Sequence, residues 1–178
     1  MEKKSKKKTY LTIYKGINNP ILREISKEIE FIDENIQNFW LELLDTMWEK
    51  DWVWLAAPQV WHNIRMIAIT QWKSKWKKIE LKWEEIMINP KYLSKSKEML
   101  IDEEGCLSIP WITWKVERHA SIKVEYYDIN WNIQTVKAEW INARIIQHEM
   151  DHLEWILFVD KQIKEEKKID LKKSLFIK

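Results

Sequence analysis

Apolar side chains recur at helical spacing in three parts of the chain. Residues 20–30 and 32–50 place apolar residues every three or four positions, and the second segment has the stronger apolar face. Asp33 or Asn35 can cap the start of this second segment, because a short polar side chain accepts the free backbone N–H groups of a first helical turn. Residues 141–158 show the same period. We therefore expect three helices.

Between residues 63 and 136 the pattern changes to short apolar runs. Four runs rich in β-branched and aromatic residues alternate with polar turns, and they lie at residues 64–70, 78–90, 120–128 and 132–139. The sequence shows no internal repeat and no linker, and 178 residues are too few for two typical domains. The pattern predicts an α+β fold, a single domain of antiparallel β-strands packed around a central helix formed by residues 141–158.

Tryptophan and glycine occur in unusual numbers. The chain has 13 Trp and only 2 Gly, whereas glycine usually makes up about 7% of a protein. Glycine supplies the positive φ angles of turns, yet here tryptophan stands in turn settings such as Trp131 in "DINWNIQ". We infer that many of these tryptophans are glycines in the living protein, because UGA encodes tryptophan in some genetic codes and glycine in certain bacteria. The alternative is a truly tryptophan-rich protein, and we favour it for Trp40 and Trp48, which lie at helical spacing among apolar residues.

Charge is nearly balanced overall but uneven along the chain. The net charge of +2 provides no field suited to nucleic acid. Residues 1–9 form a basic tail, and residues 161–178 can form a Lys-rich helix or tail that contacts an acidic partner weakly. No apolar run reaches 18 residues and the N-terminus lacks the apolar stretch of a secretory signal, so we expect a cytoplasmic protein without membrane contact. The single cysteine, Cys106, excludes an internal disulfide.

The segment "QHEMDH", residues 147–152, contains a pattern typical of a metal site. His148 and His152 are four residues apart in a predicted helix, so both imidazoles project from one face and can share an ion. Glu149 lies beside them and can handle a proton. This is the H-E-x-x-H arrangement. Two histidines at this spacing can also be half-buried polar residues or a surface pair.

A catalytic site of this kind needs a third protein ligand, with a further position left for water. No histidine follows His152, and the acidic residues after it lie in no recognisable ligand motif. The best candidate is Cys106 in "EEGCLSIP". A lone cysteine is usually a small buried apolar residue. With a two-histidine helix in the same chain, a thiolate ligand is the better interpretation.

Three segments together resemble a known family. "WVWLAAPQ", "EGCLS" and "QHEMDH", in this order, are similar to the three motifs of the peptide deformylases, metal hydrolases that remove the formyl group from the N-terminal methionine of new bacterial proteins. The resemblance implies a catalytic domain over residues 10–160. It also places tryptophan at family glycine positions, namely Trp52, Trp54, Trp61, Trp111, Trp140 and Trp155. Turn context adds Trp72, Trp76, Trp83, Trp114 and Trp131.

The resemblance implies roles for individual residues. Cys106, His148 and His152 are expected to hold one metal ion, Fe²⁺ physiologically, with Zn²⁺, Ni²⁺ or Co²⁺ able to occupy the same site. Glu149 is expected to take a proton and deliver it to the leaving amine. The other implied residues stabilise the oxyanion (Gln59 and the backbone N–H of Leu107), bind the substrate (Val53, Trp54 as glycine, Gly105 and Ile145) or support the cysteine loop through a salt bridge (Glu104 and Arg118).

The expected partners follow from the same resemblance. They are N-formylmethionyl nascent peptides in the bacterial cytoplasm, with a ribosome contact through the basic residues 161–178 as a further expectation. We expect a monomer, because no coiled-coil pattern or interface stripe is visible. Two alternatives remain open at this point. One is another H-E-x-x-H metallopeptidase with a third ligand other than Cys106, and the other is a non-catalytic relative that binds nascent chains or ribosomes.

Overall fold

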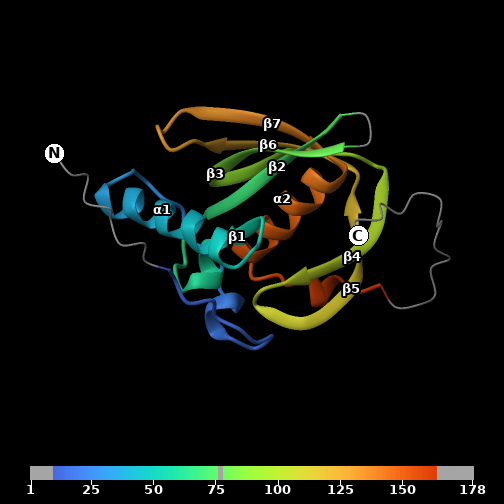
Figure 1. The fold of residues 1–178 in the computed structure, drawn as a ribbon, viewed down its shortest axis with the longest axis horizontal. Coiled ribbons are helices and arrows are strands. Elements are labelled where there is room, and N and C mark those ends of the chain that lie inside the picture. Colours follow the sequence, from blue (N-terminus) through green and yellow to red (C-terminus); the bar gives the residue numbers. More distant parts are fainter. Residues whose placement is uncertain (1–9, 76–77, 164–178) are drawn as a thin grey trace.

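A computed structural model describes residues 10–75 and 78–163 of the chain. It is a mixed α+β single domain in which antiparallel strands form two sheets and two α-helices pack against them (Figure 1). The predicted fold class is confirmed at this level. The basic tail expected at residues 1–9 lies outside the described residues, as does the Lys-rich segment from residue 164 onward.

The larger sheet has five strands in the order β1-β2-β3-β6-β7, and every neighbouring pair is antiparallel. The four predicted runs correspond to four of these strands, while the shortest strand was not predicted. The bounds are Trp54–Ala56 for β1, Met66–Lys75 for β2, Lys78–Lys95 for β3, Ser121–Tyr127 for β6 and Ile133–Glu139 for β7.

The second sheet is a hairpin of β4 (Met99–Cys106) and β5 (Ile109–His119). Its pairing runs from Met99 opposite His119 to Cys106 opposite Ile109, with an irregularity between Glu104 and Cys106. Leu107 and Ser108 form the turn, so the only cysteine lies at the closed end of the hairpin.

Helix α1 (Glu34–Glu49) begins where the sequence indicated, because the Asp33 carboxylate accepts the backbone N–H of Ile36 at 2.8 Å. The helix expected at residues 20–30 is wrong beyond one short turn, the 3₁₀ helix η1 (Pro20–Arg23). After this turn the backbone bonds to distant segments instead: the Ser26 N–H donates to the Leu153 carbonyl, and that of Lys27 donates to the Asn63 carbonyl. These long-range bonds outweigh the local helical pattern.

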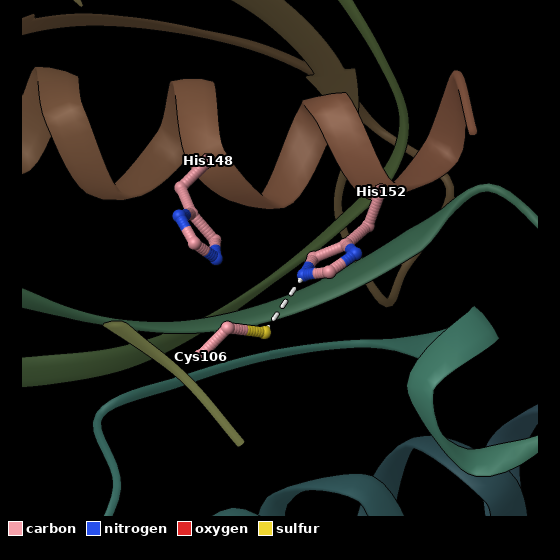
Figure 2. Close-up of side chains that lie close together, drawn as sticks. All are labelled: Cys106, His148 and His152. Atoms are coloured by element: carbon pink, nitrogen blue, oxygen red, sulfur yellow. Dashed lines mark hydrogen bonds between the residues drawn. The ribbon is translucent and has the colours of Figure 1, made fainter. Parts of the chain in front are cut away.

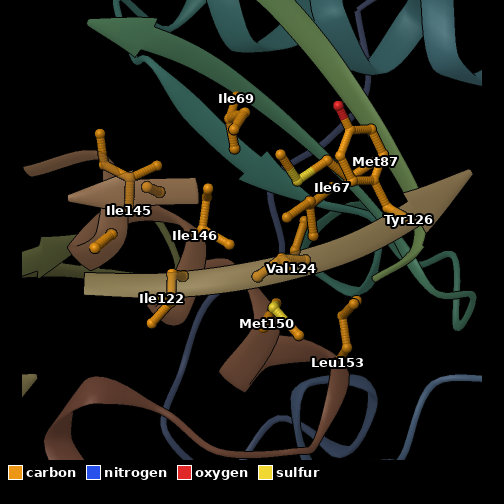
Figure 3. Packing of buried hydrophobic residues seen from close by; sticks show 13 residues of the cluster. Ile67, Ile69, Met87, Ile122, Val124, Tyr126, Ile145, Ile146, Met150 and Leu153 are labelled. Carbon is orange, nitrogen blue, oxygen red and sulfur yellow. The ribbon is translucent and has the colours of Figure 1, made fainter. Parts of the chain in front are cut away.

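Helix α2 (Trp140–Leu153) packs against the larger sheet (Figure 1). Buried apolar residues of the sheet and the helix form the core between them (Figure 3), among them Ile67, Ile69, Ile122 and Val124 on strands and Ile145, Ile146, Met150 and Leu153 on α2. The helix stops five residues before the expected end, since Trp155 has a left-handed φ of 57° that a right-handed helix does not accommodate. In the described part of the chain, no helix combines the length and apolar character needed to cross a membrane.

Left-handed backbone is concentrated at tryptophan. Among the described residues other than glycine, seven have positive φ, and five of these seven are tryptophan. An L-residue with a large side chain rarely adopts this conformation. The five are Trp61 (φ 70°), Trp111 (69°), Trp131 (63°), Trp140 (55°) and Trp155 (57°).

Candidate metal centre

The fold brings Cys106, His148 and His152 together from two separate elements. Cys106 comes from the end of β4, and the two histidines lie one turn apart on α2. Figure 2 shows the three side chains converging, all of them buried, and one potential ligand atom from each lies within 4.8 Å of the others. The Cys106 Sγ is 3.3 Å from the His152 Nε2. The arrangement matches a three-ligand site.

Three buried groups at this point have polar atoms without hydrogen-bond partners within the described chain, one of them the Nδ1 of His152. The His148 Nε2 has none, while its Nδ1 lies 2.9 Å from the Glu104 Oε2. Both carboxyl oxygens of Glu149 also have none. Buried polar atoms are nearly always paired in folded proteins. A cation bound by one thiolate and two imidazoles would use the free His148 nitrogen, and this donor set suits divalent iron, zinc and related ions. The residues therefore fit a transition-metal ion.

The pKa of one ligand favours its metal-binding form, and the pKa of another opposes it. Burial, and then the nearby Glu149 carboxyl, raise the pKa of the Cys106 thiol to about 12. Burial, and then His148, lower the pKa of His152 well below its usual range. A neutral imidazole is the form that binds a metal, and a divalent cation stabilises the thiolate against the protein environment.

Gln59 is held so that its amide nitrogen faces the cysteine. It lies in the 3₁₀ helix η2 (Ala57–Val60), and its Oε1 accepts the backbone N–H of Ala56 at 2.8 Å. Its Nε2 consequently points to the Cys106 Sγ at 3.3 Å and to the Ser108 Oγ at 3.1 Å. A fixed N–H donor beside a metal ligand is suited to bind an oxygen atom that gains negative charge.

Glu104 connects His148 to the buried Arg118. Its carboxylate accepts two hydrogen bonds from Arg118, at 2.9 and 2.8 Å, which confirms the expected salt bridge. Burial by itself would raise the pKa of Glu104, but the bonds from Arg118 and His148 outweigh it and hold this pKa far below its usual range. Glu104 is therefore an anion that fixes the imidazole of His148 through Nδ1 and leaves Nε2 for a ligand.

Glu149 is fully buried next to the histidines without bonding to them. Its Oε1 is 3.9 Å from the His148 Nε2. Burial, and then the charge of Glu104, raise the pKa of Glu149 well above its usual range. A carboxyl group whose pKa is raised in this way, close to a metal site, is a candidate for proton transfer.

The expected substrate-binding residues are less closely grouped. Trp54 pairs with Ile69 in the sheet, and its indole ring lies 6.5 Å from the His148 ring, measured between centroids. Its Nε1 is buried with no hydrogen-bond partner in the described chain. Ile145 is buried in the core and Val53 is half-buried, with its carbonyl accepting the Thr70 N–H, so a pocket shared by these two residues stays a prediction.

Two further expected positions lie next to Cys106. Leu107 belongs to the turn of the β4–β5 hairpin, which puts its backbone beside the cysteine. Gly105 lies in β4, and a Cβ atom there would be 3.6 Å from Thr113 Cγ2, an ordinary contact distance. The space around residue 105 therefore does not by itself require glycine.

Two residues of the site were not predicted from the sequence, Ser108 and Arg144. The Ser108 Oγ accepts a hydrogen bond from the same Gln59 Nε2 that donates to the Cys106 Sγ. Arg144 donates to the Glu104 Oε1 at 2.6 Å. Arg144 precedes His148 by four residues, so helical spacing alone could have placed both side chains on the same face of α2.

Comparison with known proteins gives a consistent result. The family model for polypeptide deformylase matches residues 12–168. The chain is 41% identical over 145 residues to a peptide deformylase of Desulfitobacterium hafniense, covering 82% of this chain and 90% of that protein. It is 39% identical over 142 residues to a peptide deformylase of Brucella suis, covering 80% and 79% respectively.

Solved structures agree with the sequence comparison. A class I type b peptide deformylase from Acinetobacter baumannii with Met-Ala-Ser bound matches with a TM-score of 0.80 and 31% identity, over 87% of this chain and 99% of that chain. A peptide deformylase from Synechococcus elongatus in complex with actinonin matches with a TM-score of 0.77 and 34% identity, over 93% and 85%. These matches do not favour another metallopeptidase or a non-catalytic relative.

Proposed function

Because the chain belongs to the polypeptide deformylase family, we propose that Cys106, His148 and His152 hold the metal ion of an enzyme that removes the formyl group from N-terminal formylmethionine. The observation that carries this assignment is the convergence of the three ligand atoms within 4.8 Å. Family membership makes the enzyme a metal-dependent hydrolase that acts on newly made proteins.

The side chains around the centre divide the chemistry between them. A bound divalent ion would supply Lewis acidity and lower the pKa of a water molecule. Glu149 would accept a proton from the water whose oxygen bonds to the formyl carbon, and would return this proton to the amine as the formyl C–N bond breaks and formate leaves. The Gln59 Nε2 and the backbone N–H of Leu107 donate to the formyl oxygen while negative charge develops on it. Glu104 keeps His148 in the tautomer that leaves Nε2 free.

We propose Fe²⁺ as the physiological ion, with Zn²⁺, Ni²⁺ or Co²⁺ as substitutes. One thiolate and two imidazoles form a donor set that all four ions accept, so the choice depends on supply in the cell. Val53, residue 54, Gly105 and Ile145 are proposed to contact the substrate. The first three would lie along its backbone, and Val53 with Ile145 would contact its methionine side chain.

The tryptophans bear directly on this proposal. Five of the eleven positions proposed to be glycine have left-handed backbone, the conformation for which glycine is the usual residue. Trp40 and Trp48, which we regard as true tryptophans, instead pack in helix α1, where the Trp48 Nε1 donates to the Glu84 Oε1 at 2.7 Å. We propose that the eleven positions are UGA codons decoded as glycine. At position 54, glycine would remove the indole that lies beside His148.

Formate release tests both parts of the proposal. Two synthetic genes encode the sequence as printed and a version with glycine at the eleven positions, and both proteins are loaded anaerobically with Fe²⁺ and given a formyl-Met peptide. We expect formate from the glycine version and little from the printed one. Two folded, metal-loaded proteins without activity would overturn the deformylase assignment. Equal activity of both would overturn the codon assignment alone.

The remaining proposals concern the ends of the chain and its setting. We propose a catalytic domain at residues 10–160, a basic tail at 1–9, and a Lys-rich segment at 161–178 that docks the enzyme near the ribosome in the bacterial cytoplasm. Deletion of residues 161–178 should reduce cosedimentation with ribosomes, and unchanged cosedimentation would remove the docking proposal. We further propose a monomer, which sedimentation equilibrium checks directly.

A further inference from the structure

We propose that Arg144 is a positioning residue of the metal centre, which locks the histidine-bearing helix onto the cysteine-bearing hairpin and orients His148 through Glu104. This inference rests on the metal centre of the proposed function. It concerns a residue that lies outside the three sequence motifs and whose guanidinium hydrogen-bonds to Glu104, Val116 and Leu100 rather than to a metal ligand.

Arg144 makes three hydrogen bonds from a buried position on α2. Its Nη1 donates to the Glu104 Oε1 at 2.6 Å and to the Val116 carbonyl at 3.0 Å, and its Nη2 donates to the Leu100 carbonyl at 2.8 Å. Leu100 belongs to β4 and Val116 to β5. One guanidinium therefore joins the helix to both strands of the hairpin.

Glu104 is the point at which this link reaches the metal site. Its Oε1 accepts from Arg144 and from Arg118, and its Oε2 accepts from Arg118 and lies 2.9 Å from the His148 Nδ1. Each carboxylate oxygen thus has two partners. With both oxygens held in this way, rotation of the carboxylate that would release His148 breaks bonds to Arg144 or Arg118.

The charges around Glu104 support a role for the Arg144 guanidinium beyond simple packing. Glu104 and Asp151 are buried carboxylates, and Arg118 bonds to both of them. Asp151 is also paired with Lys161 at 2.6 Å, whereas Glu104 is paired with Arg118 and Arg144, so Arg144 is the second positive charge on Glu104. A buried charge that loses a partner is strongly destabilised, and its surroundings rearrange to solvate it. We therefore expect loss of Arg144 to disturb the carboxylate that orients His148.

The test compares Arg144→Lys with Arg65→Lys in the full chain. Lysine keeps the charge, but its three N–H donors share one nitrogen, so it does not reproduce the geometry in which Nη1 reaches Glu104 and Val116 while Nη2 reaches Leu100. Arg65 is a matched control, because its guanidinium also joins a carboxylate, Glu154 at 2.6 Å, to a backbone carbonyl, that of Pro90, but touches no residue of the metal centre.

The readouts are the affinity for Co²⁺, measured by competition with a chromophoric chelator, and the thiolate-to-Co²⁺ absorption band. Supporting contacts of metal ligands typically change affinity about 10- to 100-fold, so we expect a loss of this size in Arg144→Lys and none in Arg65→Lys. Urea unfolding of both variants without metal verifies that the comparison is made on folded protein. Arg144→Met provides a second variant that lacks both the charge and the N–H donors of the guanidinium.

The outcomes separate this inference from the proposed function. Unchanged Co²⁺ affinity and an unchanged thiolate band in folded Arg144→Lys or Arg144→Met would overturn the positioning role. An equal loss of affinity in Arg65→Lys would overturn it too, since a general loss of stability would then explain the effect. A missing thiolate band in the unsubstituted chain would instead contradict the metal centre itself.

Discussion

The thiol sulfur of Cys106 lies 3.3 Å from Nε2 of His152, although the two residues are 46 positions apart in the sequence. Cys106 is at the closed end of a hairpin and His152 is near the end of α2. The contact therefore exists only when the hairpin is docked on the helix. Metal affinity should report on this tertiary contact as well as on the identity of the ligands.

Removing one ligand should remove the metal. We expect Cys106→Ala and His148→Gln to lose most of the metal bound by the unsubstituted chain, because two remaining side chains hold a divalent ion weakly. Metal analysis after gel filtration gives the number of ions per chain. His62→Gln is the control, since the His62 ring stacks on Phe39 and belongs to another part of the fold. Full metal content in Cys106→Ala would indicate a different third ligand.

Glu149→Gln should separate metal binding from catalysis. The Glu149 carboxyl lies 3.9 Å from the His148 Nε2, which is too far for a hydrogen bond, and the amide of glutamine has the same shape as a protonated carboxyl. We expect unchanged metal content and a fall in kcat of about 10²- to 10⁴-fold, the usual contribution of a general acid–base group. Glu154→Gln, at the C-cap of the same helix, where the carboxylate pairs with Arg65, should retain activity. A kcat loss below tenfold in Glu149→Gln would contradict the proton-transfer role.

The sequence pattern predicted the local parts of this fold well. Alternation of apolar residues identified β2, β3, β6 and β7, and the apolar face with its Asp33 cap identified α1. The spacing of His148 and His152 was sufficient to place both on one helical face, and the family motifs linked them to Cys106. Each of these features depends on residues that are close together in sequence or on a motif.

Features set by long-range contacts were missed. Residues 24–30 have a helical pattern, but their backbone groups bond to residues 63 and 153. The hairpin strands β4 and β5 are rich in charged residues, and two buried ones pair with α2: Glu104 with Arg144, and Arg118 with Asp151. A sequence pattern does not reveal that a buried cluster of opposite charges will replace apolar packing at that position.

Ionisation of the buried Tyr126 should make the free energy of unfolding depend on pH in the alkaline range. Burial, and then the contact of its hydroxyl with Glu85, raise the pKa of Tyr126 above its usual value of about 10. A raised folded-state pKa gives stability that is fully present below pH ~10 and is lost as pH rises toward the folded-state pKa, because the unfolded state loses its proton first.

We therefore expect Tyr126→Phe to be less stable than the unsubstituted chain at pH 8, by about 1 kcal/mol for the lost hydrogen bond. The difference should shrink as pH rises above ~10, since phenylalanine does not ionise. Urea unfolding at several pH values measures both curves. A constant difference across the alkaline range would show that Tyr126 does not contribute to the alkaline loss of stability.

A single position offers the clearest test of the tryptophan assignment. Trp111 has a left-handed φ of 69°, and its side chain is 100% exposed, so its replacement removes strain without removing packing. The left-handed conformation costs an L-residue about 1–2 kcal/mol, and glycine loses about 0.5–1 kcal/mol through its greater freedom in the unfolded chain. We expect Trp111→Gly to raise the free energy of unfolding by about 0.5–1 kcal/mol.

The matched control is Trp40→Gly, which replaces a tryptophan of helix α1 that packs against the core. Glycine in a helix interior costs about 1 kcal/mol relative to alanine, and the lost indole contacts add to this cost, so Trp40→Gly should be destabilising. Urea unfolding gives both values. If position 111 is encoded as glycine, the two substitutions should change the free energy of unfolding in opposite directions, because of the two positions only 111 has left-handed backbone. A loss of stability in both variants would mean that the fold has adapted to tryptophan at position 111.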